Sequence, residues 1–163
     1  MTKNEIIGFP YKKLNFPSFE IIGFTKIVKS GGEAYDEIRN SEKWELLKEM
    51  NVKEKSIFGI ASMDKECPKD FYRYTMGIKK DDGYICNEQF KKELYSFIVK
   101  ESEWIIFSLN FSNEYGKLWR NDPYKIIKDL GYNFNNNVGI HIDVFDENYD
   151  GNEMEFWMPI KIG

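Results

Sequence analysis

An internal repeat constrains the fold of this chain more than any other feature. Residues 74–79, Tyr-Thr-Met-Gly-Ile-Lys, align with residues 156–161, Phe-Trp-Met-Pro-Ile-Lys. Each copy follows an apolar run, a stretch rich in helix-forming Lys, Asp and Glu, and a second apolar run. A duplicated unit predicts two similar halves with a seam between them, and such seams are common places for small-molecule sites.

Period-two alternation and turn residues predict a β-α-β-β order in each copy. In the first copy we expect strands at 19–28, 56–62 and 71–79, and a helix over 33–50 interrupted near Asn40-Ser41. In the second copy we expect strands at 104–111, 138–145 and 154–162, and a helix over 115–130, either whole or broken where Asp122 precedes Pro123. Gly131 is expected to end that helix. Between the copies, residues 87–95 suggest a short helix or an ordered connection.

The predicted fold class is α+β, a tandem β-α-β-β repeat. Residues 1–18, which contain Pro10 and Pro17, are expected to be an N-terminal arm. Residues 19–163 then form a single domain whose halves span about 19–80 and 104–162. A chain of 163 residues suits one domain with a real core.

Charge and cysteine content exclude several classes of partner. The net charge of −4 argues against binding a nucleic-acid backbone, and it makes a cationic ligand easier to hold. Cys67 and Cys86 lack the spacing of a zinc site or a disulfide framework, so reduced thiols are expected. With no signal sequence and no apolar run of the ~20 residues that a membrane span needs, we expect a cytoplasmic protein without membrane contact.

Strand alternation predicts an unusual mixed face in the second copy. On residues 138–145 the aliphatic side chains alternate with polar ones, and residues 104–111 and 154–160 alternate in the same way. We expect the more aliphatic faces to lie against the helix. The other face then carries Trp104, His141, Asp143, Glu155 and Trp157.

Carboxylates beside indole rings suit a flat lipophilic cation, because the rings attract positive charge and a partly dry carboxylate adds Coulomb attraction. Simpler interpretations stay open: Asp143 and Glu155 as solvated strand positions, and the tryptophans, Trp119 included, as core. His141 is the only histidine, and the sequence around it contains no catalytic or metal-binding motif, which favours a structural role. Neither a nucleotide-binding motif nor a metal-ligand pattern occurs, so neither a cofactor nor a metal ion is expected.

Five segments, in this order over about residues 19–162, resemble the GyrI-like effector-binding domain: FEIIGF, FYRYTMGIKK, WIIFSLNF, GYNFNNNVGIHIDVFDEN and MEFWMPIK. This domain also occurs at the C-terminus of AraC-type and MerR-type multidrug-responsive regulators. The resemblance implies an antiparallel sheet, a pseudo-twofold axis and a ligand cleft between the halves, lined by aromatic rings and holding an acidic residue that meets cationic drugs or dyes.

Carried over residue by residue, the resemblance implies ligand-binding roles for five positions. These are Glu155, Trp157, Trp104, Asp143 and Tyr74, to which the pattern of the second copy adds His141 and Trp119. There are two departures. Many members have a tryptophan late in the second helix, where this chain has Ile126 and Ile127. Alternation also places Tyr74 on an aliphatic face, whereas the resemblance implies the cleft.

Three functions follow as hypotheses. The leading one is a stand-alone protein that captures lipophilic or cationic aromatic compounds, for drug sensing or sequestration. The alternative is a hydrolase of reactive, cyclopropane-type electrophiles, with Glu155 as general base and Tyr74 as proton donor. The third is a gyrase-inhibitor-like partner of a topoisomerase, through the acidic loop 146–150. Residues 1–18 are too short for a DNA-reading domain, so regulation would need a separate regulator as partner. Monomer and dimer both stay open.

Overall fold

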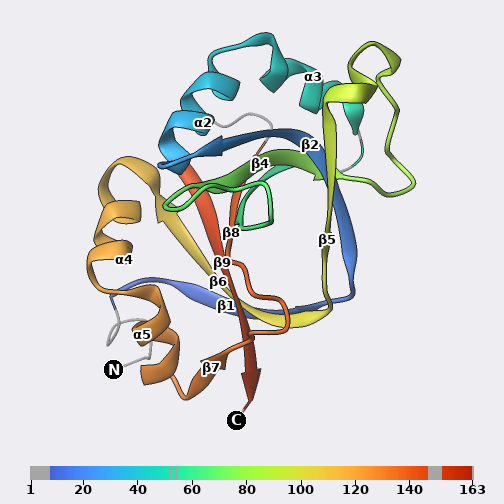
Figure 1. Cartoon of the computed structure of the whole chain (residues 1–163). Coiled ribbons are helices and arrows are strands. Elements are labelled where there is room, and N and C mark those ends of the chain that lie inside the picture. Colours follow the sequence, from blue (N-terminus) through green and yellow to red (C-terminus); the bar gives the residue numbers. More distant parts are fainter. Residues whose placement is uncertain (1–7, 52, 54, 147–151, 163) are drawn as a thin grey trace. The chain divides into compact units, whose positions relative to one another are not determined.

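The computed structural model describes residues 8–51, 53, 55–146 and 152–162 (Figure 1). The chain contains both helices and strands, and the strands pair antiparallel, which confirms the predicted α+β class. The chain divides into two compact units, each described by itself. Unit 1 comprises Met1–Ser18 and Lys100–Gly163, and unit 2 comprises Phe19–Val99.

Unit 2 is a four-stranded antiparallel sheet with two helices. Its strands lie in the order β3-β4-β2-β5. The elements along the chain are β2 (Phe19–Val28), α2 (Gly31–Arg39), α3 (Glu42–Met50), β3 (Ser56–Ser62), β4 (Tyr72–Lys79), the 3-10 helix η1 (Glu88–Glu93) and β5 (Leu94–Val99). The strand bounds 19–28 and 56–62 agree with the prediction from sequence.

Unit 1 is an antiparallel sheet built around its last strand. β9 pairs with β6 along one side and with β8 and β7 along the other, while β1 pairs with the far side of β6. The elements along the chain are β1 (Tyr11–Phe16), β6 (Ser102–Asn110), the π-helical turn η2 (Phe111–Tyr115), α4 (Gly116–Arg120), α5 (Pro123–Asp129), β7 (Tyr132–Phe134), β8 (Ile142–Asp146) and β9 (Glu153–Ile162).

Both predicted helices are broken, at the places where the sequence carries capping residues. Ser41 separates α2 from α3, and its hydroxyl accepts a hydrogen bond from the backbone N–H of Lys43. Asp122 separates α4 from α5, and its carboxylate accepts from the N–H groups of Tyr124 and Lys125. Gly131 follows α5 with φ +94°, a conformation that favours glycine.

Three strands are absent from the prediction. Residues 11–16, expected within an N-terminal arm, form β1, and β5 and β7 were not anticipated. β1 and β5 lie at the ends of their units' strand orders, and most of their side chains are exposed or half-buried, so they lack the apolar alternation of a central strand. The strand expected at 138–145 begins only at Ile142, because Gly139 adopts φ +74° and the chain turns before it. Residues 147–150 of the acidic loop lie outside the described part.

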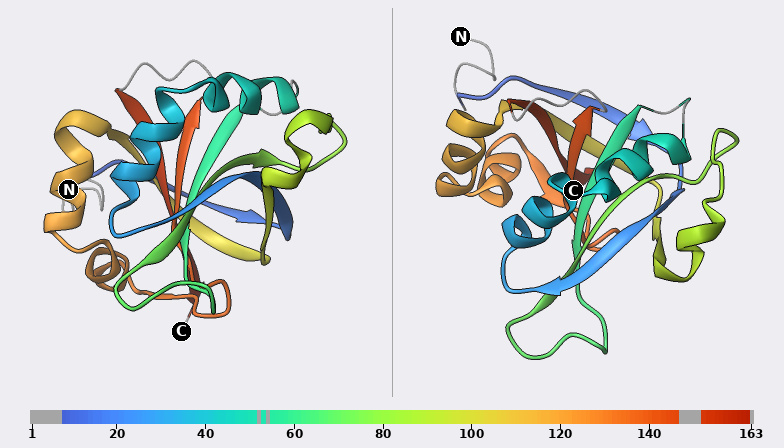
Figure 2. Two further views of the ribbon diagram at one scale, coloured as in Figure 1. Left: turned by 45° about the horizontal axis from the view of Figure 1, so that its top comes forward. Right: turned by 90° about the horizontal axis from the view of Figure 1, so that it is seen from above.

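The helices of each unit cover one face of its strands (Figure 2). In unit 2, Lys26 of β2 forms ion pairs with Glu33 and Glu37 of α2, which identifies the face of Lys26 as the helix face. In unit 1, Trp119 of α4 packs edge-on against Phe156 of β9, with ring centroids 5.5 Å apart. The opposite face of each sheet, away from these helices, is called its open face below. The name refers to the helices and not to solvent, because many side chains on this face are buried.

Candidate functional site

Three of the predicted site residues share the open face of unit 1. In the antiparallel pair of β6 and β9, Ile106 lies opposite Trp157 and Ser108 opposite Glu155. Directly opposed residues project to the same side of a sheet, and Trp104 stands two positions from Ile106. Strand alternation therefore places Trp104, Glu155 and Trp157 together, on the side away from Phe156 and α4.

Together with Lys12 and Phe16 of β1, these three residues form a group that we call the Trp157 cluster: Lys12, Phe16, Trp104, Glu155 and Trp157. The indoles of Trp104 and Trp157 lie 5.9 Å apart between ring centroids, tilted by 59°. The ring of Phe16 stacks on the indole of Trp157, with ring centroids 5.0 Å apart and an interplanar angle of 8°. Trp104 is fully buried and Trp157 is 6% exposed, so the rings provide an apolar, poorly solvated wall.

Glu155 brings a carboxylate to this wall. Its side chain keeps 32% of its exposure, its Oε1 accepts a hydrogen bond from the indole N–H of Trp157 at 3.1 Å, and its Oε2 lies 3.6 Å from the ammonium of Lys12. The indole N–H of Trp104 has no hydrogen-bond partner among the described residues. The cluster thus combines a negative charge, two indoles and one buried donor that no described side chain or backbone group satisfies.

Asp143 does not belong to this cluster, and the face assigned to it from sequence is wrong. It lies opposite Phe156 in the pair of β8 and β9, whereas Ile142 lies opposite Trp157 and Val144 opposite Glu155. The alternation within this strand is as predicted, but the sides are exchanged. The aliphatic side chains face the Trp157 cluster, and Asp143 lies on the helix face.

His141 and Trp119 also gather on the helix face, around Phe156. The ring of His141 stacks on that of Phe156 with centroids 5.0 Å apart, and it makes a T-shaped contact with the ring of Trp119 at a centroid distance of 5.1 Å. The Asp143 carboxylate, 5% exposed, accepts hydrogen bonds from the Tyr115 hydroxyl at 3.1 and 3.2 Å. Burial lowers the pKa of His141 from 6.5 to about 4, so its imidazole is neutral at pH 7. We call these five residues the Phe156 cluster.

Tyr74 lies on the helix face of unit 2. It is opposite Lys26, which pairs with α2, and it is 5% exposed. Strand alternation predicted this side. Its hydroxyl occupies space over Gly59, where an added Cβ would lie only 2.1 Å from the oxygen. The glycine is therefore required for Tyr74 to pack as it does.

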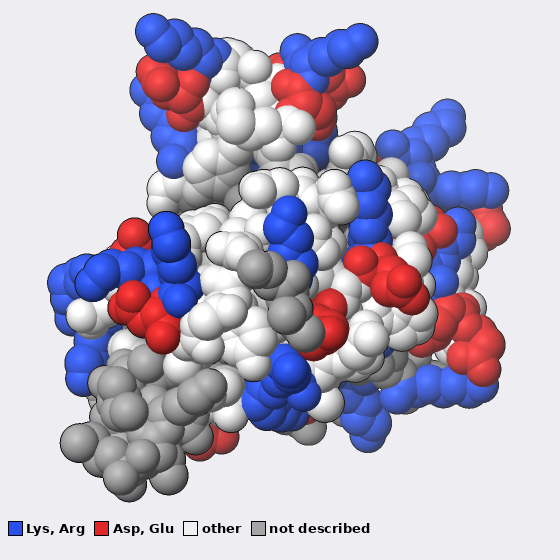
Figure 3. All heavy atoms as spheres, turned by 90° about the horizontal axis from the view of Figure 1, so that it is seen from below, with Lys and Arg blue, Asp and Glu red and all other residues white. Residues whose placement is uncertain are grey.

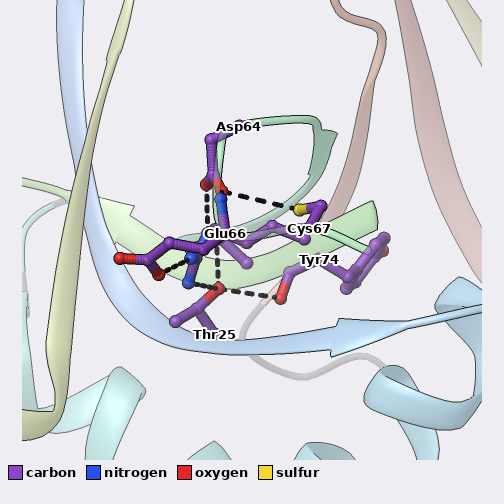
Figure 4. Close-up of polar contacts among 7 residues, drawn as sticks. Thr25, Asp64, Glu66, Cys67 and Tyr74 are labelled. Atoms are coloured by element: carbon purple, nitrogen blue, oxygen red, sulfur yellow. Dashed lines mark hydrogen bonds and ion pairs between the residues drawn. The ribbon is translucent and has the colours of Figure 1, made fainter. Parts of the chain in front are cut away.

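The open face of unit 2 carries a buried cation in place of an acid. Arg73 is equivalent in the repeat to Glu155, and its side chain is only 8% exposed. Its Nε donates to Asp64 at 2.6 Å and its Nη2 to Glu66 at 2.7 Å. Both acids, labelled in Figure 4, come from the loop between β3 and β4. The guanidinium also lies 4.7 Å from the ring centre of Tyr95. The hydrogen bond that Arg73 donates to Asp64 lowers the pKa of the Asp64 carboxyl.

Sequence reasoning missed Lys12, Phe16, Tyr115 and Arg73. Lys12 and Phe16 lie in a segment whose prolines and exposed polar residues concealed a strand. Arg73 did carry a signal, because a charged residue inside an otherwise apolar strand needs partners, and the acidic turn at Asp64 and Glu66 precedes it.

The described residues hold no group of three or more His, Cys, Asp or Glu side chains that could bind a metal ion. No helix within the described ranges is long and apolar enough to span a membrane. Among the described side chains visible in Figure 3, those of Lys and Arg are interspersed with those of Asp and Glu.

Residues 9–161 match the family described as the GyrI-like small molecule binding domain, which is nearly the whole chain. The chain belongs to this family. Small-molecule binding is therefore the function that the GyrI-like family assigns to it, and the matched range includes β1 together with both units. No protein with curated function matches the sequence significantly.

Solved structures agree with the GyrI-like fold. SAV2435 bound to tetraphenylphosphonium is 13% identical, with a TM-score of 0.66 over 93% of this chain and 94% of its own. A putative bacterial transcription regulation protein from Staphylococcus aureus MU50 is 13% identical, with a TM-score of 0.65 over 94% and 99%. The EcmrR C-terminal domain is 11% identical, with a TM-score of 0.61 over 95% and 99%. At these identities the likeness shows the shared fold.

Proposed function

We propose that this GyrI-like chain binds lipophilic aromatic cations on the Trp157 cluster, with Glu155 as the counter-charge. The observation that carries the proposal is the carboxylate of Glu155, held 3.1 Å from the indole nitrogen of Trp157 within a group of aromatic rings. Indole faces attract cations by ~0.5–2 kcal/mol per contact, and a carboxylate at a poorly solvated wall adds a Coulomb term that bulk water would weaken.

The comparisons support the chemical class of the ligand. SAV2435, which shares the fold, is described as bound to tetraphenylphosphonium, a cation whose charge is surrounded by phenyl rings. Such a cation is weakly hydrated, so it gives up little on entering an apolar site and gains contact with rings and a carboxylate. We propose the same recognition chemistry for this chain, in the sensing or sequestration of such compounds.

The proposal is tested by titrating the protein with tetraphenylphosphonium and following tryptophan fluorescence and the melting temperature. We expect quenching and a rise in melting temperature, because a ligand that binds only the folded state stabilises it. Glu155→Gln removes the charge and keeps the shape, and it should weaken binding by about tenfold. Equal affinity in this variant would reject an acidic site.

Unit 1 offers a matched control. Glu103 is also on the sheet, with a side chain 34% exposed compared with 32% for Glu155, and it pairs with Lys13 at 3.7 Å as Glu155 pairs with Lys12 at 3.6 Å. It lies on the helix face, next to Trp104 in β6. Glu103→Gln should leave the affinity unchanged. Tetraphenylborate, an anion of the same shape, should bind far more weakly than tetraphenylphosphonium.

The other two hypotheses from sequence stay predictions. Hydrolysis of a reactive electrophile, with Glu155 as base and Tyr74 as donor, would appear as turnover that Glu155→Gln abolishes and Glu103→Gln preserves. A topoisomerase partner would be recovered from cell lysate by the immobilised protein. A separate regulator as partner and the cytoplasmic location are also predictions from sequence, which decides for neither monomer nor dimer.

A further inference from the structure

Lys12 and Phe16 of β1 contact the two groups that the proposed ligand would contact. The pairing of β1 with β6 sets Lys12 opposite Ile106 and Phe16 opposite Ser102. Ile106 is in turn opposite Trp157, so these alternate residues of β1 project to the open face of unit 1. From there the Lys12 ammonium reaches Glu155 at 3.6 Å, and the Phe16 ring stacks on Trp157 at 5.0 Å.

A cation on the carboxylate and a flat ring on the indole are the two contacts expected of a lipophilic aromatic cation. We propose that β1 supplies an internal competitor for the ligand, with Lys12 in the place of its charge and Phe16 in the place of its ring. The ligand then binds by displacing these two side chains. This inference rests on the proposed function, since it concerns access to the same Trp157 cluster.

The contacts have the strength that a competitor needs. Lys12 is 56% exposed, and ion pairs of exposed lysines contribute little because the ammonium stays hydrated and water screens the charge. Phe16 is half-buried, so part of its ring is already in water, and the face of Trp157 that it uncovers on rotating away is covered again by the aromatic ring of the ligand. Both side chains can leave while the backbone of β1 keeps its pairing with β6.

The competitor also determines which molecules bind. A small hydrated cation replaces Lys12 with no gain from the rings, and a neutral aromatic molecule replaces Phe16 but leaves Glu155 paired to Lys12. A molecule that carries both a weakly hydrated positive charge and an aromatic ring replaces both at once. Lys12 and Phe16 are therefore specificity-determining residues, although the ligand's own contacts are with Glu155 and the tryptophans.

The test uses Lys12→Gln and its neighbour Lys13→Gln as matched variants. Lys13 has a similar ion pair, to Glu103 at 3.7 Å, but on the other face of the strand. We expect Lys12→Gln to tighten tetraphenylphosphonium binding by about two- to fivefold, the range that an exposed ion pair allows, and Lys13→Gln to leave it unchanged. Phe16→Leu, which removes the stacked ring and keeps an apolar side chain, should also tighten binding.

A double variant separates this competition from other effects of charge. In a Glu155→Gln background, Lys12→Gln should no longer change the affinity, because the carboxylate that holds Lys12 is gone. Unchanged or weaker binding in Lys12→Gln, with Glu155→Gln still weakening it, overturns the internal competitor and leaves the proposed function intact. If the wild-type protein binds no tetraphenylphosphonium, or binds it without dependence on Glu155, the proposed function itself is rejected.

Discussion

Mild acidification, to about pH 5, should destabilise this protein through His141. It is the only histidine of the chain, and burial lowers its pKa from 6.5 to about 4 in the folded state. The unfolded chain therefore binds the proton more readily than the folded chain between these two values. His141 leaves the free energy of unfolding unchanged above about pH 7 and lowers it as the pH falls below 6.5. Its effect is complete once the pH is below about 4.

The magnitude follows from the two pKa values. The difference between 6.5 and about 4, at ~1.36 kcal/mol for each pKa unit, gives a total loss of ~3 kcal/mol. The linkage relation places about 2 kcal/mol of that loss above pH 5. For a domain whose free energy of unfolding is ~5–15 kcal/mol, such a loss is easily measured.

The assay is urea unfolding followed by tryptophan fluorescence at pH 7.5 and pH 5, for the wild type and for His141→Phe. Phenylalanine keeps a ring against Phe156 and Trp119 but cannot take up a proton. We expect the wild type to lose about 2 kcal/mol more than the variant between the two pH values. Equal losses, or an imidazole NMR signal that titrates near pH 6.5, would refute the argument from burial.

Two pairs of substitutions test the packing around the candidate residues. Trp157→Phe should lower the free energy of unfolding more than Trp104→Phe does, by ~1 kcal/mol or more, because only the indole of Trp157 donates a hydrogen bond to a carboxylate. The reverse order, expected if depth of burial alone mattered, would contradict this. Gly59→Ala should destabilise by ~1–3 kcal/mol because its Cβ would lie 2.1 Å from the Tyr74 hydroxyl, and Tyr74→Phe in the same chain should recover part of that loss in chemical denaturation.

Central strands and helix ends were predictable because their signals are local. β2 and β3 have apolar residues whose spacing is visible in the sequence, and Ser41 and Asp122 cap helices through hydrogen bonds to residues two or three positions ahead. β1 carries no such signal. Its side chains are mostly exposed, and its place depends on pairing with β6, about 90 residues away along the chain.

The candidate site was predictable within a strand but not between strands. Alternation correctly grouped Glu155 with Trp157 and Ile142 with Val144. Which group lies beneath a helix depends on the register between β8 and β9, and a shift of one residue exchanges the faces. The assumption that the aliphatic side must meet the helix failed because Asp143 has a partner there, the Tyr115 hydroxyl.

The two halves of the repeat differ in how firmly each holds its open-face charge, and this difference supports the proposal that the ligand is a cation. Arg73 is 8% exposed and donates to two carboxylates at 2.6 and 2.7 Å, so an anionic ligand would have to break short, charge-assisted hydrogen bonds to reach it. Glu155 is 32% exposed, and its lysine partner lies 3.6 Å away and is largely in water. Of these two charges, only the carboxylate can exchange its partner at little cost. The repeat therefore gives each unit an ionised residue at the same position, but it leaves the negative one available to a ligand.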